Sequence, residues 1–349
     1  MMHKEANVFD VASLAGVSRG TVDRVVYGRG RVSEKTVAKV REAIRRLDYR
    51  PNPRASSLAR KKICRIAYII PRSRKGEYWD LIDKGFSMDR DMLSRYNIEL
   101  HPFYYDISDE DSFRLCCRKA LECEPSGVIT NEAPKEALLE MVSALEQKNI
   151  PLSFIDTKYD DIDYALYCGI DAYKSGELGA FLLTNHQEVD SVVIIGIRRH
   201  NKAIDASATR KQGVTDYLSS HFRGCRIFNV DIWGEPSEDN DAALDAFICE
   251  HPQVKHFICP NSRLHLVAQW FEKHPDPSRV VVGYDDLDLN LQALKTGAAD
   301  FLVTRKVPEQ SGALLMDFAE CIVHGEKPLK RNRFVHMDIL HRMNLDDYR

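Results

Sequence analysis

From residue 63 onward, the sequence alternates between short apolar runs and longer amphipathic stretches. Ten of the apolar runs have the length of a strand, and helical patterns separate most of them. This alternation is typical of parallel sheets covered by helices, and ten strands favour two sheets over one. The expected strands are 65–70, 98–105, 127–130, 152–156, 165–170, 192–197, 226–232, 256–259, 280–284 and 301–304, with a last strand and a short tail in 334–345. The expected helices include 81–96, 135–148, 175–186, 209–222 and 309–324.

The chain has 349 residues, enough for two or three domains with substantial cores. No apolar stretch is long enough to span a membrane and no long apolar segment opens the sequence, so we expect a cytoplasmic protein. The nine cysteines are odd in number and include no pair of CxxC motifs. We therefore expect reduced core cysteines, without structural zinc or a cofactor.

The first residues carry a different pattern, two short helices joined by a tight turn. Apolar residues recur at helical spacing from Val8 to Ala15 and again from Val17 to Val25, with Gly16 at the corner. Ser18 is a good N-cap for the second helix, because its hydroxyl accepts from an unpaired backbone N–H. The pattern predicts a helix-turn-helix, whose second helix enters the major groove of DNA.

The charge distribution supports this interpretation. Residues 1–62 contain fifteen Lys and Arg against six Asp and Glu, a net charge of +9, whereas the remaining residues carry −12. A basic head suits contact with phosphates, and an acidic body suits solubility. The alternative is a small three-helix bundle with a solvated basic face.

A third helix is expected over 33–47, with Ser33 as its N-cap. Pro51 and Pro53 stop this helix, and Pro53 can also open a short helix over 54–60. A helix of that length does not persist alone in water, so its order must come from a partner.

The chain resembles the LacI/GalR family of bacterial transcription regulators. Three parts carry the resemblance, in this order along the chain: DVASLAGVSRGTVDRVV, RVSEKTVAKVREAIRRLDYRPNPRASSLAR and the strand–helix body. The resemblance implies an α/β protein with an all-α helix-turn-helix domain (1–50) and a hinge helix (51–62). A sensor domain (63–345) similar to type I periplasmic binding proteins follows, with two doubly wound parallel-sheet subdomains. We expect the N-subdomain at about 63–165 and 299–326, and the C-subdomain at about 166–298 and 327–345.

The resemblance also implies how DNA is read. Arg19, Gly20 and Arg24 match the family positions that reach base edges, and arginine can pair with O6 and N7 of guanine together. Asp23 departs from the family's small hydroxyl residue, and we expect it to pair with Arg19 across one helical turn. Leu58 matches the leucine that enters the minor groove. The expected DNA-binding residues are Ser18, Arg19, Gly20, Thr21, Arg24, Arg31, Asn52, Arg54, Ala55, Leu58 and Lys61.

The sensor domain is expected to bind a small molecule between its subdomains, where strand-exit loops meet. Tyr78 and Trp79 match aromatics that stack on sugars, and Asp285 in VVVGYDD matches a carboxylate that accepts from sugar hydroxyls; the alternatives are core packing and a helix cap. The expected ligand-binding residues are Arg72, Tyr78, Trp79, Asn131, Asp156, Lys158, Asp171, Arg210, Asn261, Asp285 and Arg305.

Several positions depart from the sugar-binding pattern. Ala208 stands where relatives often carry arginine, Asn261-Ser262 replaces an Asn-Asp pair, and Arg305 replaces a frequent glutamine. Four cations could make the cleft positive, which favours an acidic sugar, a sugar phosphate or another anion. These cations are Arg72, Lys158, Arg210 and Arg305.

The sequence thus predicts a homodimeric, sugar-responsive DNA-binding repressor of carbohydrate metabolism genes, with double-stranded DNA and a small-molecule effector as partners. The alternatives are a sensor of a non-sugar anion or nucleobase, and a solute-binding protein. An enzyme is disfavoured, because the sequence contains no P-loop, no GxSxG and no HExxH motif.

Overall fold

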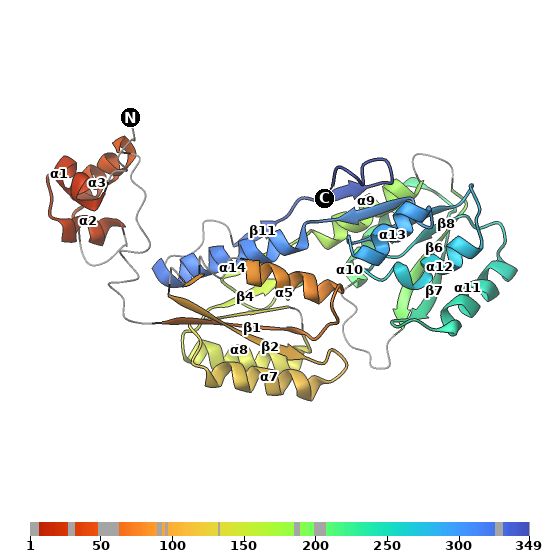
Figure 1. The fold of residues 1–349 in the computed structure, drawn as a ribbon, viewed down its shortest axis with the longest axis horizontal. Helices are drawn as coiled ribbons and strands as arrows, with labels where there is room; N and C mark the ends of the chain where they lie inside the picture. Colours follow the sequence, from red (N-terminus) through yellow and green to blue (C-terminus); the bar gives the residue numbers. More distant parts are fainter. Residues whose placement is uncertain are drawn as a thin grey trace.

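The computed structural model describes residues 7–26, 32–47, 63–88, 93–94, 97–131, 133–184, 189–198, 207–324 and 331–348. They form a small helical head and a body built on two sheets, which we call the first and second lobes (Figure 1). The expected hinge, residues 51–62, lies outside the described residues, as does Arg31. No helix in the described ranges is long and apolar enough to cross a lipid bilayer.

The head contains the three expected helices, α1 (Val8–Ala15), α2 (Arg19–Val26) and α3 (Glu34–Arg46). Val11, Val22 and Val40, one from each helix, are fully buried and centre its apolar core. Gly16 ends α1 with a φ of 66°, a left-handed conformation that glycine adopts at little cost. The helix-turn-helix geometry is therefore confirmed.

The expected N-caps of the second and third helices are also confirmed. The Ser18 hydroxyl accepts from the Thr21 amide at 3.2 Å, and the Ser33 hydroxyl accepts from the Thr36 amide at 3.4 Å. Each bond satisfies one of the amides that a helix start leaves without an intrahelical partner.

The first lobe is a six-stranded parallel sheet in the order β11-β5-β4-β3-β1-β2. Figure 1 shows helices α5 and α14 on one side of this sheet and α7 and α8 on the other. Its strands are β1 (Cys64–Pro71), β2 (Ile98–Tyr105), β3 (Gly127–Thr130), β4 (Leu152–Ile155), β5 (Leu166–Gly169) and β11 (Asn332–Phe334). Its helices are α5 (Tyr78–Met88), α7 (Glu110–Glu122), α8 (Lys135–Gln147) and α14 (Val307–His324).

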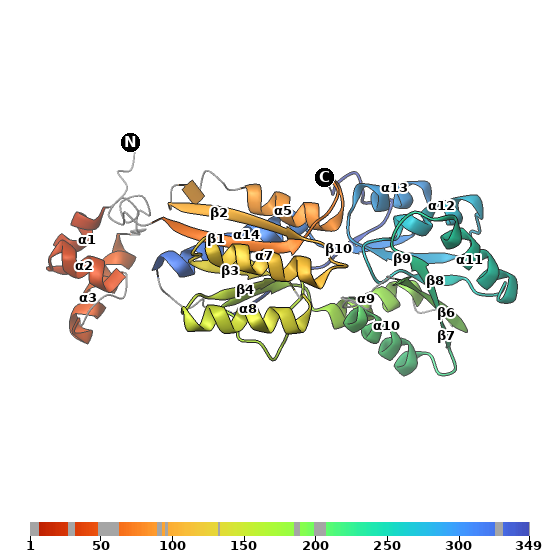
Figure 2. The same cartoon turned by 90° about the horizontal axis from the view of Figure 1, so that it is seen from below.

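The second lobe repeats this plan with the strand order β12-β10-β9-β8-β6-β7, except that β12 runs antiparallel to β10. Helices α9 and α10 cover one face and α11 to α13 the other (Figure 2). The strands are β6 (Ser191–Arg198), β7 (Arg226–Trp233), β8 (His256–Ile258), β9 (Val280–Tyr284), β10 (Phe301–Thr304) and β12 (Asp338–Leu340). The helices are α9 (Ala172–Thr184), α10 (Ala208–His221), α11 (Glu238–Glu250), α12 (His265–Lys273) and α13 (Asp288–Thr296).

All ten expected strands form, but the expected subdomain boundaries were wrong. Strand β5 pairs with β4 and belongs to the first lobe, whereas β10 pairs with β9 and belongs to the second. The chain therefore crosses between the lobes after its fifth and tenth strands, rather than before them. The single strand expected in 334–345 is two short strands, β11 in the first lobe and β12 in the second, because the chain crosses once more between them.

Candidate functional site

Helix α2 presents a polar face to solvent. Ser18, Arg19, Gly20 and Arg24 are exposed, and Thr21 is half-buried with its hydroxyl 3.0 Å from that of Ser18. Because Gly20 carries no side chain, the arginines are the long donors on this face. The predicted DNA-binding residues that the structure describes thus all lie on α2 or at its N-cap.

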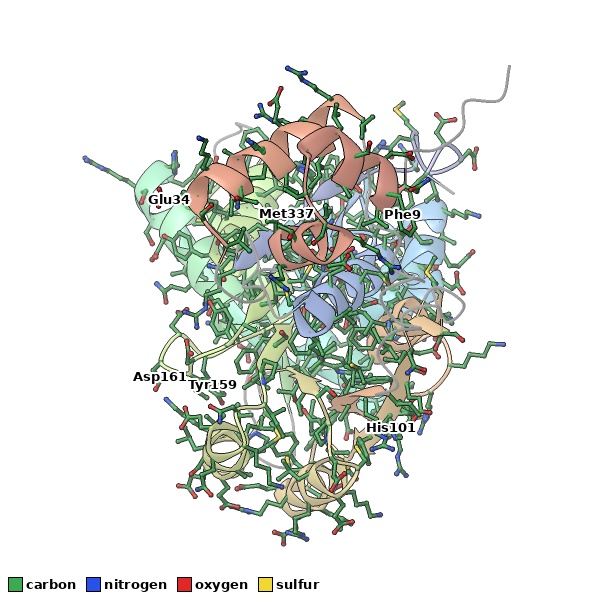
Figure 3. All side chains as sticks on the ribbon, turned by 90° about the vertical axis from the view of Figure 1, so that its left-hand side faces the viewer. Phe9, Glu34, His101, Tyr159, Asp161 and Met337 are labelled. Carbon is green, nitrogen blue, oxygen red and sulfur yellow. The ribbon has the colours of Figure 1, made fainter. Side chains whose placement is uncertain are left out.

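Two neighbours hold Arg19. Its Nε lies 3.8 Å from Oδ2 of Asp23, the pairing expected from the i, i+4 spacing. Its guanidinium carbon lies 5.4 Å from the centre of the Phe9 ring, and Phe9 on α1 is itself 62% exposed (Figure 3). An exposed ion pair contributes less than about 1 kcal/mol to stability, so these contacts orient Arg19 rather than stabilise the fold.

In the body, two predicted carboxylates occupy equivalent places in the lobes. Asp156 directly follows β4 and Asp285 directly follows β9, the corresponding strand of the second sheet. Their φ angles are 68° and 64°, and their amides donate to Cys168 O (2.9 Å) and Val303 O (3.0 Å) of the next strand. Left-handed backbone at a residue other than glycine costs about 1–3 kcal/mol and is characteristic of binding sites.

Arg305, which follows β10 of the second lobe, joins both lobes. Its side chain is 3% exposed, and its Nη2 donates to Oδ1 of Asp156 and to the hydroxyl of Tyr78, both in the first lobe. The Tyr78 hydroxyl in turn donates to Oδ1 of Asp156 at 2.6 Å. We call Tyr78, Asp156, Asp285 and Arg305 the interlobe cluster.

The interlobe cluster has unused hydrogen-bonding capacity. Nε and Nη1 of Arg305 are buried without a partner among the described residues. Asp285 is 5% exposed, and no described group hydrogen-bonds its carboxylate. Buried polar atoms without a partner are rare in native proteins, so the free donors of Arg305 are available to a ligand.

Burial also sets the protonation of the cluster. It raises the pKa of Asp285, an effect that the positive charges of Arg305 and Arg210 oppose. Burial raises the pKa of Tyr78 well above its ordinary value, so its hydroxyl stays protonated and acts as a donor. For Arg305, burial lowers the pKa, but Tyr78 and the two carboxylates more than reverse this. The guanidinium is therefore charged at any physiological pH.

Arg210 is fixed on the second lobe. Its Nε donates to the Ser175 hydroxyl at 2.8 Å and its Nη1 to Pro260 O at 3.0 Å. Its guanidinium carbon lies 4.3 Å from the centre of the Tyr284 ring, whose hydroxyl donates to Ser175 O at 2.9 Å. Two of the three guanidinium nitrogens of Arg210 are thus already engaged.

The other predicted ligand residues make contacts outside the cluster. Lys158 pairs with Asp160, Asp171 accepts from the Lys174 amide at the start of α9, and buried Asn131 bonds to the Tyr105 hydroxyl. Trp79 packs edge-on against Tyr78 at a centroid distance of 5.3 Å, and Arg72 is exposed. Asn261 accepts from the Arg263 amide, while its Nδ2 is buried without a partner among the described residues.

These contacts change the expected charge of the cleft. Arg305 faces the carboxylates Asp156 and Asp285, Lys158 is paired, and Arg210 donates to neutral groups. Carboxylates thus offset two of the four cations, Arg305 and Lys158, whereas hydrogen bonds to neutral groups leave the charge of Arg210 in place. The helix-cap alternative for Asp285 is wrong, because α13 starts without a side-chain cap.

Two tyrosines of this region were missed. Tyr167 donates to Asp156 O at 2.9 Å and so supports the turn that carries this carboxylate, and Tyr284 lies under Arg210. Both stand near the end of an apolar strand, Tyr284 directly before Asp285. A tyrosine near the end of an apolar strand was the sequence signal that could have identified them.

Comparison with known proteins agrees with both parts of the molecule. Residues 7–52 match the family model of bacterial regulatory proteins, lacI family, and residues 66–327 match that of the periplasmic binding protein domain. The HTH-type transcriptional regulator pepR1 of Lactobacillus delbrueckii subsp. lactis is 28% identical over 235 residues, 66% of either chain. Catabolite control protein A of Streptococcus mutans is 44% identical over 104 residues, 30% of this chain and 29% of that protein. The matched stretches thus span less than two thirds of these relatives' lengths.

Solved structures share the fold of the body. A protein from Bacteroides fragilis described as a LacI transcriptional regulator aligns with a TM-score of 0.77 at 24% identity, over 82% of this chain and all of that one. GanP, a glucose-galactose binding protein from Geobacillus stearothermophilus, aligns with a TM-score of 0.69 at 20% identity, over 82% of this chain and 99% of that one. With its helix-turn-helix head and two-lobed periplasmic-binding-protein body, the chain belongs to the lacI family of bacterial regulatory proteins.

Proposed function

We propose that this protein is a sequence-specific transcription regulator of carbohydrate metabolism genes, a repressor that binds its operator as a dimer. A neutral sugar bound at the interlobe cluster controls its affinity for DNA. Such a role is regulatory rather than catalytic, and it is exercised in the cytoplasm, where the chromosome lies.

One observation carries the proposal of an effector site: Arg305 connects the lobes through Asp156 and Tyr78 while two of its nitrogens remain buried and unpartnered. A ligand that satisfies these donors and the Asp285 carboxylate contacts both lobes together. Such a ligand favours the arrangement in which the lobes approach each other. The ligand therefore acts on the orientation of the lobes, and through β1 on the segment that leads to the head.

The chemistry of the interlobe cluster favours a neutral polyol. Both forks of a guanidinium include Nη2, and Nη2 of Arg305 is already engaged by Asp156 and Tyr78. A carboxylate or phosphate thus finds no open fork, although single donors remain for hydroxyl oxygens. Asp285 supplies an acceptor for a hydroxyl proton. In keeping with this chemistry, relatives include the sucrose operon repressor of Staphylococcus xylosus, and structural neighbours were solved with D-arabinose and D-allose.

On DNA, Arg19 and Arg24 supply the base contacts, and residues 51–60 form a hinge helix whose Leu58 enters the minor groove. A helix this short folds only when it packs against its counterpart on the duplex. Leu58→Ala should therefore weaken specific operator binding by at least about tenfold while sugar binding stays unchanged. If Leu58→Ala and the wild-type protein bind the operator with equal affinity, the proposed insertion of Leu58 into the minor groove is wrong.

Selection of bound oligonucleotides by the full chain tests the proposal as a whole. It is performed without ligand and with sucrose, D-glucose, D-galactose, D-arabinose, D-ribose, D-allose, D-glucuronate or D-glucose 6-phosphate. We expect a two-fold symmetric consensus, and a change in recovery with one neutral sugar. A response to the acidic sugars alone contradicts the neutral effector, and the absence of any enriched sequence contradicts the regulator.

A further inference from the structure

The segment that follows β12 folds back onto the second lobe. Leu345 is 4% exposed and belongs to the apolar core beneath α11 to α13. Asn344 closes the turn, because its Nδ2 donates to Ile339 O at 3.0 Å and its amide donates to His341 O at 3.0 Å. Residues 341–348 therefore form an anchored turn.

This turn places Tyr348 against the residues that follow two members of the interlobe cluster in the chain. The Tyr348 hydroxyl donates to Oδ2 of Asp286 at 3.2 Å, and Nζ of Lys306 lies 5.8 Å from the centre of its ring. Asp286 directly follows Asp285, and Lys306 directly follows Arg305. One side chain thus contacts the turns that present both second-lobe members of the cluster.

A buried hydroxyl, that of Thr304, lies near the Asp286 carboxylate. Thr304, the last residue of β10, is 2% exposed. Burial raises the pKa of Asp286, and the nearby hydroxyls of Thr304 and Tyr348 oppose this rise. The Thr304 hydroxyl itself donates to Arg305 O at 3.4 Å. The Asp286 carboxylate therefore lies among groups from three segments: the exit of β9, the end of β10 and the anchored turn.

The backbone at Asp285 needs such support. Its φ of 64° is a conformation that residues other than glycine keep only when their surroundings impose it. Its own carboxylate has no described hydrogen-bond partner, so neighbouring residues hold the turn. Asn290 Nδ2 donates to Asp285 O at 3.1 Å on one side, and Tyr348 bonds to the next residue, Asp286, on the other.

We propose that Tyr348 is a positioning residue of the effector site, which fixes the relative placement of Asp285 and Arg305 by linking the exits of β9 and β10. This inference rests on the proposed function, since it assigns a role in a site whose ligand is itself proposed.

Hydrogen exchange resolved to single amides tests the link without any ligand. Two amides report on the turns: Asp285, which donates to Val303 O at 3.0 Å, and Gln310, which donates to Lys306 O at 2.9 Å. Tyr348→Phe in the full chain keeps the ring and removes the hydroxyl. We expect exchange at Asp285 to rise at least about fivefold and at Gln310 by less, because only the bond to Asp286 is lost.

Tyr173→Phe is the matched control. The Tyr173 hydroxyl donates to Asp216 at 3.0 Å, also in the second lobe, but Asp216 lies on α10 and not on either turn. This variant should leave exchange at both reporter amides unchanged. Unchanged exchange at Asp285 in Tyr348→Phe overturns the proposal. A uniform rise across the second lobe also overturns it, because that pattern means general stabilisation rather than positioning.

Calorimetric titration with the six neutral sugars named above adds the functional readout. Where the wild-type protein binds one of them, Tyr348→Phe should weaken binding about tenfold, and Tyr173→Phe should not. Equal affinity of Tyr348→Phe and wild type contradicts the role of Tyr348. Where the wild type binds none of the six, the proposed neutral-sugar effector fails, and the exchange experiment still decides the link.

Discussion

The two lobes have the same sheet plan but treat the carboxylate after the fourth strand differently. Asp156 and Asp285 share their place in the sheet, their left-handed backbone and an amide bond to the neighbouring strand. Asp156 is paired with Arg305 and Tyr78, whereas the carboxylate of Asp285 has no described partner. The first lobe thus holds a completed contact, and the second holds an acceptor that remains available.

In both lobes a glycine allows two paired helices to approach each other closely. A Cβ on Gly85 of α5 would lie 1.9 Å from the Ser311 hydroxyl and 2.1 Å from Pro308 O of α14, and one on Gly213 of α10 would lie 2.1 Å from Tyr173 O of α9. In the second lobe, α9 adds a glycine of its own, Gly176, beside Arg210 O. Each of these contacts involves a backbone carbonyl, which cannot move away by a side-chain rotation. The lobes differ in that both helices of the second-lobe pair carry such a glycine.

The largest expected difference concerns the two carboxylates. Asp156→Asn keeps the size of the side chain and tolerates the left-handed backbone, but it leaves the buried Arg305 charge without its partner. We expect a loss of about 3 kcal/mol in the free energy of unfolding, because breaking a buried ion pair leaves an uncompensated charge. Urea denaturation measures this loss. An Asp156→Asn protein as stable as wild type would show that the contact of Arg305 with Asp156 between the lobes is not formed in solution.

The helix contacts should give an intermediate effect. Gly213→Ala and Gly85→Ala each force a methyl group into an occupied space, at a cost of about 1–3 kcal/mol. The two losses should be similar, since each new methyl group would meet a backbone carbonyl at 2.1 Å, Pro308 O in the first lobe and Tyr173 O in the second. Thermal denaturation measures both losses.

Gly297→Ala provides the reference for these helix variants. Gly297 has a φ of 80°, and a Cβ there would meet no atom within 4 Å, so its substitution measures backbone strain without overlap. If either helix variant loses no more stability than Gly297→Ala, the close approach of that helix pair does not limit the size of the residue at the glycine.

The smallest effect should have the opposite sign. Asp285→Asn removes a buried carboxylate whose pKa is raised by burial, so near pH 7 it should increase stability by roughly 1 kcal/mol, or about 2–4 °C in Tm. A raised pKa in the folded state means that wild-type stability falls as pH rises through the interval between the unfolded and folded pKa values. The advantage of Asn should therefore vanish below about pH 4, near the ordinary aspartate pKa.

Melting curves of wild type and Asp285→Asn from pH 4 to pH 8 check this dependence. A constant difference in Tm across that range contradicts the raised pKa. The same variant should lose sugar binding, so stability and function would change in opposite directions at this residue.

Local features of the head could be predicted from the sequence with accuracy. Gly16, Ser18 and Ser33 act within one or two turns of their own position, and each does what its residue type indicates. The ten strands were also predictable from apolar runs. The lobe to which each strand belongs was not predictable. β5 and β10 are both short apolar runs, and their sheet partners depend on where the chain crosses between the lobes, which no local pattern shows.

The same limit applies to the effector site. Tyr78, Asp156, Asp285 and Arg305 were identified one by one, yet the contact of Arg305 with Asp156 joins positions 149 residues apart. The sequence suggested a positive cleft because it shows neither that Asp156 and Asp285 face Arg305 nor that Asp160 pairs with Lys158. The equivalence of the lobes was hidden too, since corresponding residues such as Cys168 and Val303 share a backbone role and no chemistry.

Helix α14 seals one face of the first sheet, with Leu315 and Phe318 in its core, although the ribosome makes α14 only after nearly all of the second lobe. The first lobe therefore stays incomplete while well over a hundred further residues are synthesised. During that time α14 does not yet cover one apolar face of its sheet. A truncated product that stops before residue 307 should be prone to aggregation or in need of a chaperone.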